Sequence, residues 1–514
     1  MDFVLSLLAG TKKRAHFLNQ RESKEQRAHR ERAPREKTHA GGMHREDEEG
    51  GGGGEEPEEV SMPVGGFKQG GIDAEWVAKL TARLVWGTKC VEAAKFTKVV
   101  MQEQLVVALL NAAHTLLKRE PCVVDVASTN GAGKTQVVIV GDTHGQFHDV
   151  LRVLEMAPGM PSSSCQFVWN GDFVDRGSWG LESMLVLLAW KLAAPDSVYL
   201  LRGNHETKYC SMMYGFKGEL EAKFGTSMGS FDKPKGMWMA FLRIFASLPL
   251  AAAIGDGAAL VLHGGLFRAP QDSKRAQEEE AAGTHRRKKK KPKKKKRARD
   301  EDEEMGEEVE PGTVIRSARV GTIDELRAAG KGGEDPLPDY MTSASDKSRM
   351  AADVLWSDPG GQPGFRASDR GIGCVHGPDI LREFARLHPS LKLVVRSHEG
   401  PDAREEGTET DRARGFSSLH SGFSVDQEEP GGARLVTVFS APSYPQHEPG
   451  ADNRASIVVL SGPHFGTEYD VITYDAAPRP EARCYYELDD EDLATTEPEG
   501  AACWIDSGDE VEVP

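Results

Sequence analysis

The chain has 514 residues and a formal net charge of −16 at pH 7, and this length is enough for two or three domains. Its seven cysteines are scattered and form no zinc-spaced cluster, which fits a reducing compartment and argues against a disulfide framework. The apolar stretch at residues 3–9 is too short to span a membrane and follows no basic segment, so we expect neither membrane insertion nor a signal peptide.

The first 71 residues contain few apolar side chains. They are first basic and then acidic, and they include five consecutive glycines at 50–54. Such a segment has no core that offsets the entropy lost on ordering, so residues 1–71 are predicted to be disordered.

A helical pattern follows, with apolar residues at helical spacing from Ile72 to Leu117. It predicts a helical extension over residues 72–135 that packs on the next domain. Residues 128–135 end like a phosphate-binding Walker loop, but a β-branched run rather than a helix follows them, and Asn130-Gly131 favours a hairpin bend there.

Five motifs rich in metal-ligand residue types each follow a short apolar run. The runs occupy residues 136–140, 167–169, 198–201, 260–262 and 393–395, and the motifs that follow are Gly141-Asp-Thr-His-Gly145, Gly171-Asp-Phe-Val-Asp-Arg-Gly177, Arg202-Gly-Asn-His-Glu206, His263-Gly-Gly265 and Arg396-Ser-His-Glu399. Because open α/β sheets place their sites where strands end, the motifs are expected to meet. Helical patterns at 147–156, 181–192 and about 212–224 alternate with the first strands, which indicates an α/β domain over 136–475.

The residue types in these motifs suit two neighbouring divalent ions. Carboxylate, imidazole and amide ligands favour manganese, iron or zinc. Two such ions about 3.5–4 Å apart can activate water and stabilise the attacking and leaving oxygens at phosphorus. Each motif alone fits an ordinary turn, but the ordered series favours a two-metal phosphoesterase.

Further motifs resemble the phosphoprotein phosphatase (PPP) family of metal-dependent protein serine/threonine phosphatases. They are His263-Gly-Gly-Leu266, Val354-Leu-Trp-Ser-Asp-Pro359, Asp369-Arg-Gly371 and Ser440-Ala-Pro-Ser-Tyr444. Over residues 72–488 the chain is similar to the plant-type protein phosphatase 7 branch. Its core also resembles protein phosphatase 5, although no 34-residue tetratricopeptide repeat precedes residue 136. The resemblance implies a metallophosphoesterase-like β-sandwich flanked by helices, in four α/β/β/α layers.

The same resemblance implies two divalent metal ions and their ligands. Asp142 and His144 would hold the first ion, with Asp172 bridging to the second. The second site would be completed by Asn204, His263 and His398. A hydroxide that bridges the two ions would be the nucleophile.

The resemblance also implies the remaining catalytic roles. His205 would protonate the leaving serine or threonine oxygen, oriented and kept cationic by Asp175. Arg176 and Arg370 would clamp the phosphoryl oxygens, because a guanidinium group binds phosphate bidentately. Tyr444 would line the cleft and donate a hydrogen bond to phosphate. The plainer alternatives are surface ion pairing for Arg176 and loop packing for Tyr444.

An insertion at about 271–350 interrupts this domain. It contains a basic run at 285–299 followed by an acidic run at 300–304, and such a block stays solvated and extended. We interpret 285–299 first as a nuclear import signal bound by an import receptor, which places the protein in the nucleus, with the cytoplasm as a second location. Calmodulin, associated with the protein phosphatase 7 branch, ranks second because large apolar anchors are absent. Nucleic acid ranks third because aromatic side chains for stacking are missing.

Residues 476–514 form an acidic tail. Its simplest role is solubility. A regulatory alternative is that the acidic stretch 487–492 reaches the cationic site and mimics phosphate.

Hydrolysis of phosphoserine and phosphothreonine in phosphoprotein substrates is therefore the expected function. Another binuclear metallophosphoesterase, such as a nuclease or dinucleotide hydrolase, would share the first three motifs but not Asp369-Arg-Gly371. A catalytically silent nuclear scaffold is the non-enzyme alternative, and the presence of every expected ligand argues against it.

Overall fold

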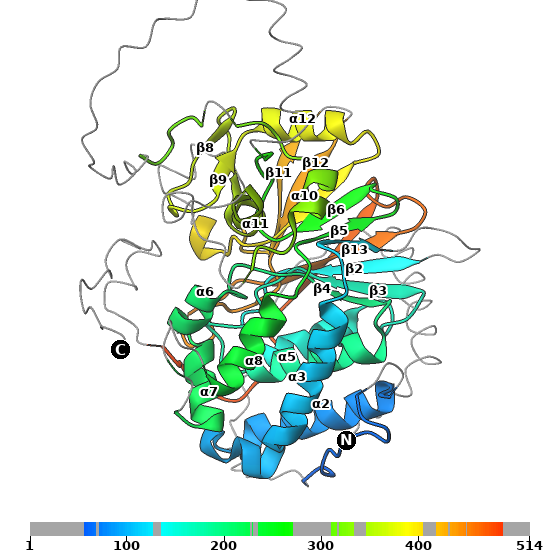
Figure 1. Ribbon diagram of the computed structural model, residues 1–514, viewed down its shortest axis with the longest axis vertical. Helices are drawn as coiled ribbons and strands as arrows, with labels where there is room; N and C mark the ends of the chain where they lie inside the picture. Colours follow the sequence, from blue (N-terminus) through cyan, green and yellow to red (C-terminus); the bar gives the residue numbers. More distant parts are fainter. Residues whose placement is uncertain are drawn as a thin grey trace, which may run out of the picture.

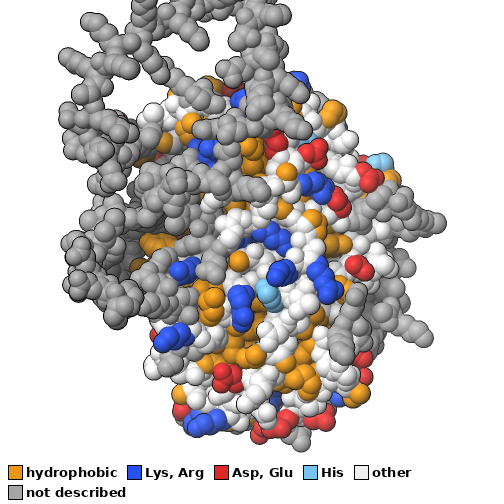
Figure 2. Space-filling model, viewed as in Figure 1, with side chains coloured by type: hydrophobic (Ala, Val, Ile, Leu, Met, Phe, Trp, Pro, Cys, Tyr) orange, Lys and Arg blue, Asp and Glu red, His pale blue; other side chains and the backbone are white. Residues whose placement is uncertain are grey.

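The computed structural model describes residues 56–67, 71–126, 135–226, 229, 235–270, 310–315, 318–333, 346–404, 418–429, 432–448 and 450–486. The predictions for residues 1–55, the bend at 128–134, the charged runs at 285–304 and the tail beyond 486 lie outside this part of the chain. Among the described helices, none combines the length and apolar character that crossing a membrane requires. On the face in Figure 2, Lys and Arg side chains spread over the middle, while Asp and Glu lie mainly toward the lower and right margins.

Two β-sheets stack face to face at the centre of the fold (Figure 1). In spatial order, the six-stranded sheet contains β1 (Val123–Val126), β5 (Ala251–Ile254), β6 (Ala259–Leu262), β10 (Leu393–Arg396), β12 (Arg434–Val438) and β11 (Phe423–Glu428). The five-stranded sheet contains β14 (Tyr469–Tyr474), β13 (Ala455–Ser461), β2 (Gln136–Val140), β3 (Cys165–Trp169) and β4 (Val198–Leu200). Between them lies an apolar core contributed by the inner faces of both sheets.

Strand β2 shows why the sequence folds into buried layers. Val137 and Ile139 face the other sheet, whereas Val138 and Val140 face the helices, because successive side chains alternate across a strand. Both faces of β2 are covered, so its sequence after Gln136 is continuously apolar rather than alternating. The parallel pairing of β2, β3 and β4 brings their carboxyl ends to one edge.

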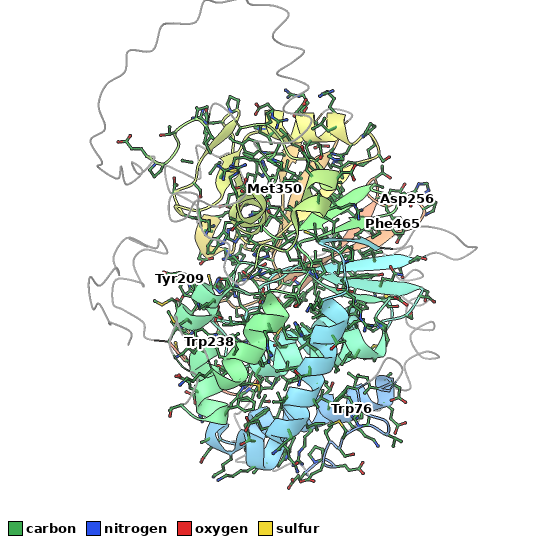
Figure 3. All side chains as sticks on the ribbon, viewed as in Figure 1. Trp76, Tyr209, Trp238, Asp256, Met350 and Phe465 are labelled. Atoms are coloured by element: carbon green, nitrogen blue, oxygen red, sulfur yellow. The ribbon has the colours of Figure 1, made fainter. Side chains whose placement is uncertain are left out.

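One helical layer covers the outer face of the five-stranded sheet. It contains α2 (Ala74–Cys90), α3 (Glu103–Leu117), α4 (Phe147–Met156), α5 (Gly180–Ala193), α7 (Phe216–Phe224) and α8 (Gly236–Phe245). The one-turn elements η1 (Ala93–Lys95) and η2 (Phe96–Val100) join α2 to α3. Trp238 is fully buried in this layer, in the lower half of Figure 3.

A second layer covers the outer face of the six-stranded sheet. It contains α10 (Ile323–Ala329), α11 (Asp346–Trp356), α12 (Pro378–Leu387) and a small sheet of β7 (Asp358–Pro359), β9 (Cys374–His376) and β8 (Phe365–Ala367). Met350 marks its core in the upper half of Figure 3. The four-layer α/β/β/α arrangement expected from the resemblance is therefore confirmed.

Two segments differ from the sequence-based expectation. Strand β1 lies inside the stretch assigned to a helical extension, yet it pairs in parallel with β5 and belongs to the six-stranded sheet. Helix α10 and the first residues of α11 lie inside the stretch assigned to a disordered insertion, yet Leu326 and Met350 are fully buried. Each segment is too short for a clear apolar period, and neighbouring charged residues hide the pattern; only contact with the sheet reveals its buried side.

The predicted helix at 212–224 is two helices in the structure. Helix α6 (Lys208–Met213) ends just before Gly215, whose φ of 121° a side chain would oppose, and α7 starts at the next residue. The break turns the chain back toward the loop that follows β3.

His148 on α4 links the helical extension to the sheet layer. Its Nε2 lies 3.2 Å from Thr88 Oγ1 on α2, and its ring packs edge to face on Trp179. Burial lowers the pKa of His148 to about 4, because a buried imidazolium loses its hydration.

Stability should therefore fall as the pH falls from about 6.5 toward about 4, since the unfolded chain gains a proton at His148 that the folded chain refuses. At about pH 5 the loss from this residue is about 2 kcal/mol relative to neutral pH. His148→Gln is expected to flatten the decline of the urea unfolding midpoint between neutral pH and about pH 5. The same change at the exposed His464 should leave the decline unaltered; an equal slope in wild type and the His148 variant would contradict the assignment.

Candidate metal centre and active site

The predicted motifs meet where strands of both sheets end. Strand β2 leads to Asp142 and His144, β3 to Asp172, β4 to Asn204 and His205, β6 to His263, and β10 to His398. The seven side chains are buried, with no more than 8% of any residue exposed. The structure thus brings together residues that are far apart in the sequence.

The backbone at these positions is unusual. Seven non-glycine residues of the described chain have a positive φ, and five of them are predicted site residues. Those five are His144 (40°), Asp172 (51°), Asp175 (70°), Arg176 (65°) and His398 (75°). A residue in this region costs about 1–3 kcal/mol and persists only where the surroundings enforce it. Such concentration at one edge marks a functional site.

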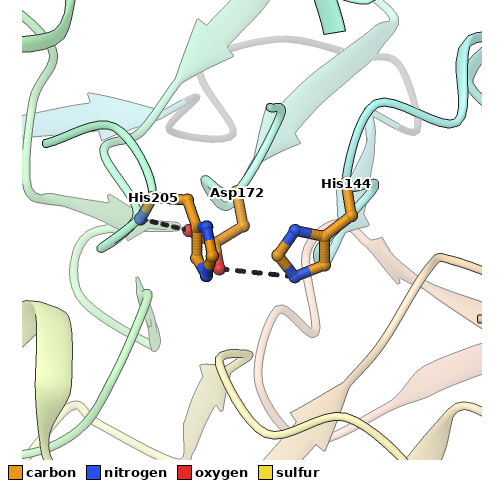
Figure 4. Close-up of side chains that lie close together, drawn as sticks. All are labelled: His144, Asp172 and His205. Carbon is orange, nitrogen blue, oxygen red and sulfur yellow. Dashed lines mark hydrogen bonds and ion pairs between the residues drawn. The ribbon is translucent and has the colours of Figure 1, made fainter. Parts of the chain in front are cut away.

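Asp172 is shared by two groups of potential metal ligands. In the first group, His144 Nε2 lies 3.7 Å from Asp172 Oδ2, and His205 lies on the other side of the same carboxylate (Figure 4). In the second, His263 Nε2 lies 3.4 Å from Asp172 Oδ2, with His398 beside it. The first group contains His205, which the resemblance makes the general acid, and Asp142, the ligand predicted in its place, has Oδ2 4.0 Å from His144 Nε2. Asp172 is common to both groups, as a bridging ligand would be.

The imidazoles turn their lone pairs toward these carboxylates. Nδ1 of His144 lies 3.2 Å from the carbonyl of Val174, and Nδ1 of His263 lies 2.7 Å from the carbonyl of Asn170. A ring that donates through Nδ1 keeps Nε2 as an acceptor, which is the usual arrangement of a metal-binding histidine.

Buried acceptors crowd together without enough donors. Nε2 of His263 lies only 2.8 Å from Asn204 Oδ1, and Nδ1 of His398 lies 3.0 Å from the same oxygen. Oδ2 of Asp142 and Nε2 of His398 have no hydrogen-bond partner among the described residues. Because buried acceptors need a donor or a cation, this set fits divalent metal ions held by carboxylate, imidazole and amide ligands.

The carboxylates and imidazoles of this cluster shift one another's pKa. Burial and the nearby Asp172 raise the pKa of Asp142 to about 8. The pKa of His263 is raised to about 9, because the carboxylates of Asp172 and Asp142 outweigh the effect of burial. Cations bound at this position would reverse both shifts.

His205 forms a buried pair with Asp175. Its Nδ1 lies 2.8 Å from Asp175 Oδ2, and Asp175 Oδ1 accepts the backbone N–H of Phe216 at 2.8 Å. Burial lowers the pKa of His205 to about 4 and raises the pKa of Asp175 well above its ordinary value. The resemblance implies that Asp175 keeps His205 cationic, whereas here burial opposes that charge. The negative charge of a phosphate ester next to His205 would favour the imidazolium.

Two guanidinium groups lie close to His205. Arg176 packs its guanidinium 4.3 Å from the ring centre of Tyr214, and Arg370 donates from Nε to Asp358 Oδ2 at 2.8 Å. The positive charges of Arg176 and Arg370 both depress the pKa of His205, in addition to burial. Their placement suits binding of phosphoryl oxygens rather than simple surface ion pairing.

Tyr444 lies against the first ligand group. Its ring stacks on that of His144, with centroids 5.0 Å apart and an interplanar angle of 28°. Its backbone N–H donates to Asn453 Oδ1 at 2.8 Å, which fixes the loop after β12. All eleven residues singled out from the sequence thus lie around one centre.

Four further residues support the site and were not assigned roles from the sequence. Glu206 accepts the backbone N–H groups of Asp172 and Phe173 at 2.7 and 2.8 Å, so it ties the β4 loop to the β3 loop. Asp358 holds both Arg370 and Arg396, each at 2.8 Å. Glu206 and Asp358 lie inside recognised motifs and could have been found there. The other two are Asn170 and Tyr214, which carry no local signal.

The shared carboxylate, the two overlapping ligand groups and the neighbouring guanidinium pair have the composition of a two-metal phosphoesterase.

Comparison with known proteins agrees with this class. The sequence pattern of the calcineurin-like phosphoesterase family matches residues 135–402. The chain is 35% identical over 438 residues to serine/threonine-protein phosphatase 7 of Arabidopsis thaliana, covering 84% of this chain and 93% of that protein. It is 32% identical over 348 residues to human serine/threonine-protein phosphatase 5, covering 68% of this chain but only 50% of the relative. The chain therefore belongs to the serine/threonine-protein phosphatases of the calcineurin-like phosphoesterase family.

A solved structure supports the same fold. A protein serine/threonine phosphatase from Saccharomyces cerevisiae superimposes with a TM-score of 0.52 at 25% identity, covering 77% of this chain and 98% of the yeast chain.

Removing the shared carboxylate should abolish binding of two ions. In the wild type the backbone N–H of His205 donates to Asp172 Oδ1 at 2.9 Å. Asp172→Asn keeps an oxygen that can accept this hydrogen bond, so the fold should persist. After dialysis against manganese, we expect about two ions per wild-type chain and fewer than one per variant chain, measured by elemental analysis. Asp196→Asn, at an exposed position, is the matched control. Equal metal content in the Asp172 variant and wild type would refute the bridging assignment.

Proposed function

We propose that this chain hydrolyses phosphoserine and phosphothreonine in phosphoprotein substrates with two divalent ions, manganese or an iron and zinc pair. The observation that carries the proposal is Asp172, which is common to two buried ligand groups beside two arginines. Metal ions held by these groups would lower the pKa of water and stabilise negative charge on phosphoryl oxygens. Asp142, His144, Asp172, Asn204, His263 and His398 would hold them.

The chain's own residues bind and orient the ester. Arg176 and Arg370 would each donate N–H groups to phosphoryl oxygens, since guanidinium matches phosphate geometry and stays charged. Asp358 fixes Arg370 through its Nε, which leaves other N–H groups of that guanidinium for substrate. Tyr444 would donate a hydrogen bond from its hydroxyl to the same phosphate.

His205 would act as the general acid. Its Nδ1 is held by Asp175, so Nε2 is the atom that would carry a proton to the leaving serine or threonine oxygen. The phosphate dianion provides the negative charge that raises the pKa of the buried imidazole, so the proton would be taken up as substrate binds. His205 would therefore be protonated when the substrate is bound, which is when the leaving oxygen needs a proton.

Two other functions fit the site less well. A nuclease or dinucleotide hydrolase needs the ligand groups. It does not need Arg370, which Asp358 holds in place through a hydrogen bond. A silent scaffold has no need for five strained residues around one centre. The relatives named as serine/threonine-protein phosphatases also favour the phosphatase.

Activity should depend on both the acid and the bridging carboxylate. We expect manganese-supported release of phosphate from a phosphoserine protein, and a loss of about 10²–10⁴-fold in kcat for His205→Asn, because proton donation to the leaving oxygen is removed. Asp172→Asn should lose at least as much. His464→Asn, at an exposed position, is the control. Wild-type rates in either site variant would overturn the mechanism.

The location and partners form a separate part of the proposal. The basic run at 285–299 is short in sequence and rich in lysine, which favours an import receptor as its partner and the nucleus as the location. Calmodulin is the second candidate partner of this run.

Deletion of 285–299 from a fluorescent fusion is expected to abolish nuclear enrichment. Replacing the neighbouring acidic run 300–304 with alanines is the control and should leave enrichment in place. A deletion variant that still concentrates in the nucleus would refute the import role.

A further inference from the structure

The last described residues of the chain run along the active-site loop. In Figure 1 the red end of the described chain lies beside α6 and α7. The backbone N–H of Ala477 donates to Asp149 Oδ1 at 2.6 Å. Farther along, Ser178 Oγ donates to the carbonyl of Arg483 at 2.7 Å and accepts its N–H at 2.5 Å. Since Ser178 lies two residues after Arg176, this segment is fastened to the loop that carries the phosphate-binding arginine.

Two glycines leave room for this segment. A Cβ atom on Gly218, inside α7, would lie 2.3 Å from the carbonyl oxygen of Tyr485, so no side chain fits there. Glycine inside a helix costs about 1 kcal/mol relative to alanine, and the contact with Tyr485 gives a reason for it. A Cβ on Gly215 would lie 3.0 Å from Cδ1 of Tyr486. Residues 485 and 486 therefore have a close-fitting seat on α7 and the turn before it.

Tyr486 reaches the guanidinium of Arg176 from this seat. The centre of its ring lies 5.4 Å from Cζ of Arg176, and the positive charge of Arg176 counteracts the rise that burial causes in the pKa of the Tyr486 hydroxyl. The hydroxyl also lies 3.3 Å from His447 Nε2. Tyr214 packs on Arg176 as well, at 4.3 Å, so two aromatic rings hold one guanidinium group.

Such a holder matters because arginine is long and flexible. Immobilising its side chain costs about 2 kcal/mol of rotamer entropy, which an arginine that binds phosphate must lose at each binding event unless it is already fixed. A cation beside an aromatic ring gains roughly 0.5–2 kcal/mol, enough to fix the group in advance. Nε of Arg176 is buried and has no hydrogen-bond partner among the described residues, so the rings of Tyr214 and Tyr486 supply much of its support.

We propose that Tyr486 is a positioning residue for phosphate binding: the carboxyl-terminal segment 477–486 forms one wall of the active site and holds Arg176 ready to receive the phosphoryl group. The inference rests on the phosphatase function and on Arg176 as a phosphate ligand. It assigns residues 483–486 to the active site, whereas the sequence alone placed them in an acidic tail whose simplest role is solubility.

The test measures inhibition by inorganic phosphate and the KM and kcat for p-nitrophenyl phosphate, on full-length protein with manganese. Tyr486→Leu fills the seat without an aromatic face and is expected to raise both the phosphate inhibition constant and KM by about tenfold, with little change in kcat. Tyr486→Phe keeps the ring and should recover most of the phosphate affinity. Gly218→Ala, which displaces the Tyr485 carbonyl, should resemble Tyr486→Leu although alanine favours a helix.

A double-mutant cycle shows whether Tyr486 acts through Arg176. In the background of Arg176→Lys, which itself weakens phosphate binding, Tyr486→Leu should add less than a twofold further loss. The matched control is Tyr469→Leu, since Tyr469 also lies near an arginine, Arg434, but belongs to β14, away from the site. It should leave KM and phosphate inhibition unchanged.

Three outcomes would overturn the proposal: unchanged phosphate inhibition in Tyr486→Leu, independent losses in the cycle, or a rise in kcat/KM in the Tyr486 and Gly218 variants. The last would make the segment a blocking rather than a positioning element. A wild-type protein inactive on p-nitrophenyl phosphate and on a phosphoserine protein would instead refute the proposed function, so the two failures are distinguishable.

Discussion

The site depends on buried acceptors that face one another around Asp172. The carboxylates of Asp142 and Asp172, the amide oxygen of Asn204 and the ring nitrogens of two histidines approach within hydrogen-bond or ion-pair distance, with too few donors among them. Water cannot solvate these groups, because they are buried. Divalent cations between them would satisfy the arrangement, which accounts for the convergence of several strand ends on one edge.

The rest of the fold holds that arrangement in place. Left-handed backbone at five site residues is unfavourable by itself, and it persists because neighbouring loops are tied together by buried groups such as Glu206 and Asn170. Those loops start from strands whose two faces are covered by apolar layers, so their ends move little relative to one another. The rigid sandwich thereby fixes the positions of the ligand side chains.

Much of the central fold could be predicted because its signals are local. The run at 136–140 becomes β2 with the same bounds, and the pattern at 147–156 becomes α4. Short apolar runs of this kind can be recognised in the sequence, and each ligand follows its strand directly. Strand β1 and helix α10 were missed because short segments with charged neighbours show no period, and their buried faces exist only against β5 and the layer above it.

The candidate site divides in the same way. Residues that bind metal or phosphate need particular functional groups at fixed positions in their loops, so Asp142, Asn204 and His263 are legible as motifs. Residues that support them act through space. Asp358 lies in a recognised motif, but the sequence did not show that it holds Arg370. Tyr214 gave no signal, because contact between an aromatic ring and a guanidinium group requires no fixed spacing in the sequence.

By itself, the sequence determined the chemistry of this protein: which ligands are present, in which order, and after which strands. Tertiary structure alone decided that the segment around Tyr486 returns to Arg176 and sits on Gly215 and Gly218. The physical reason is that a metal ligand can be recognised by its own functional group, whereas the segment around Tyr486 is placed by the surface on which it packs. That surface exists only after the helices and sheets have packed.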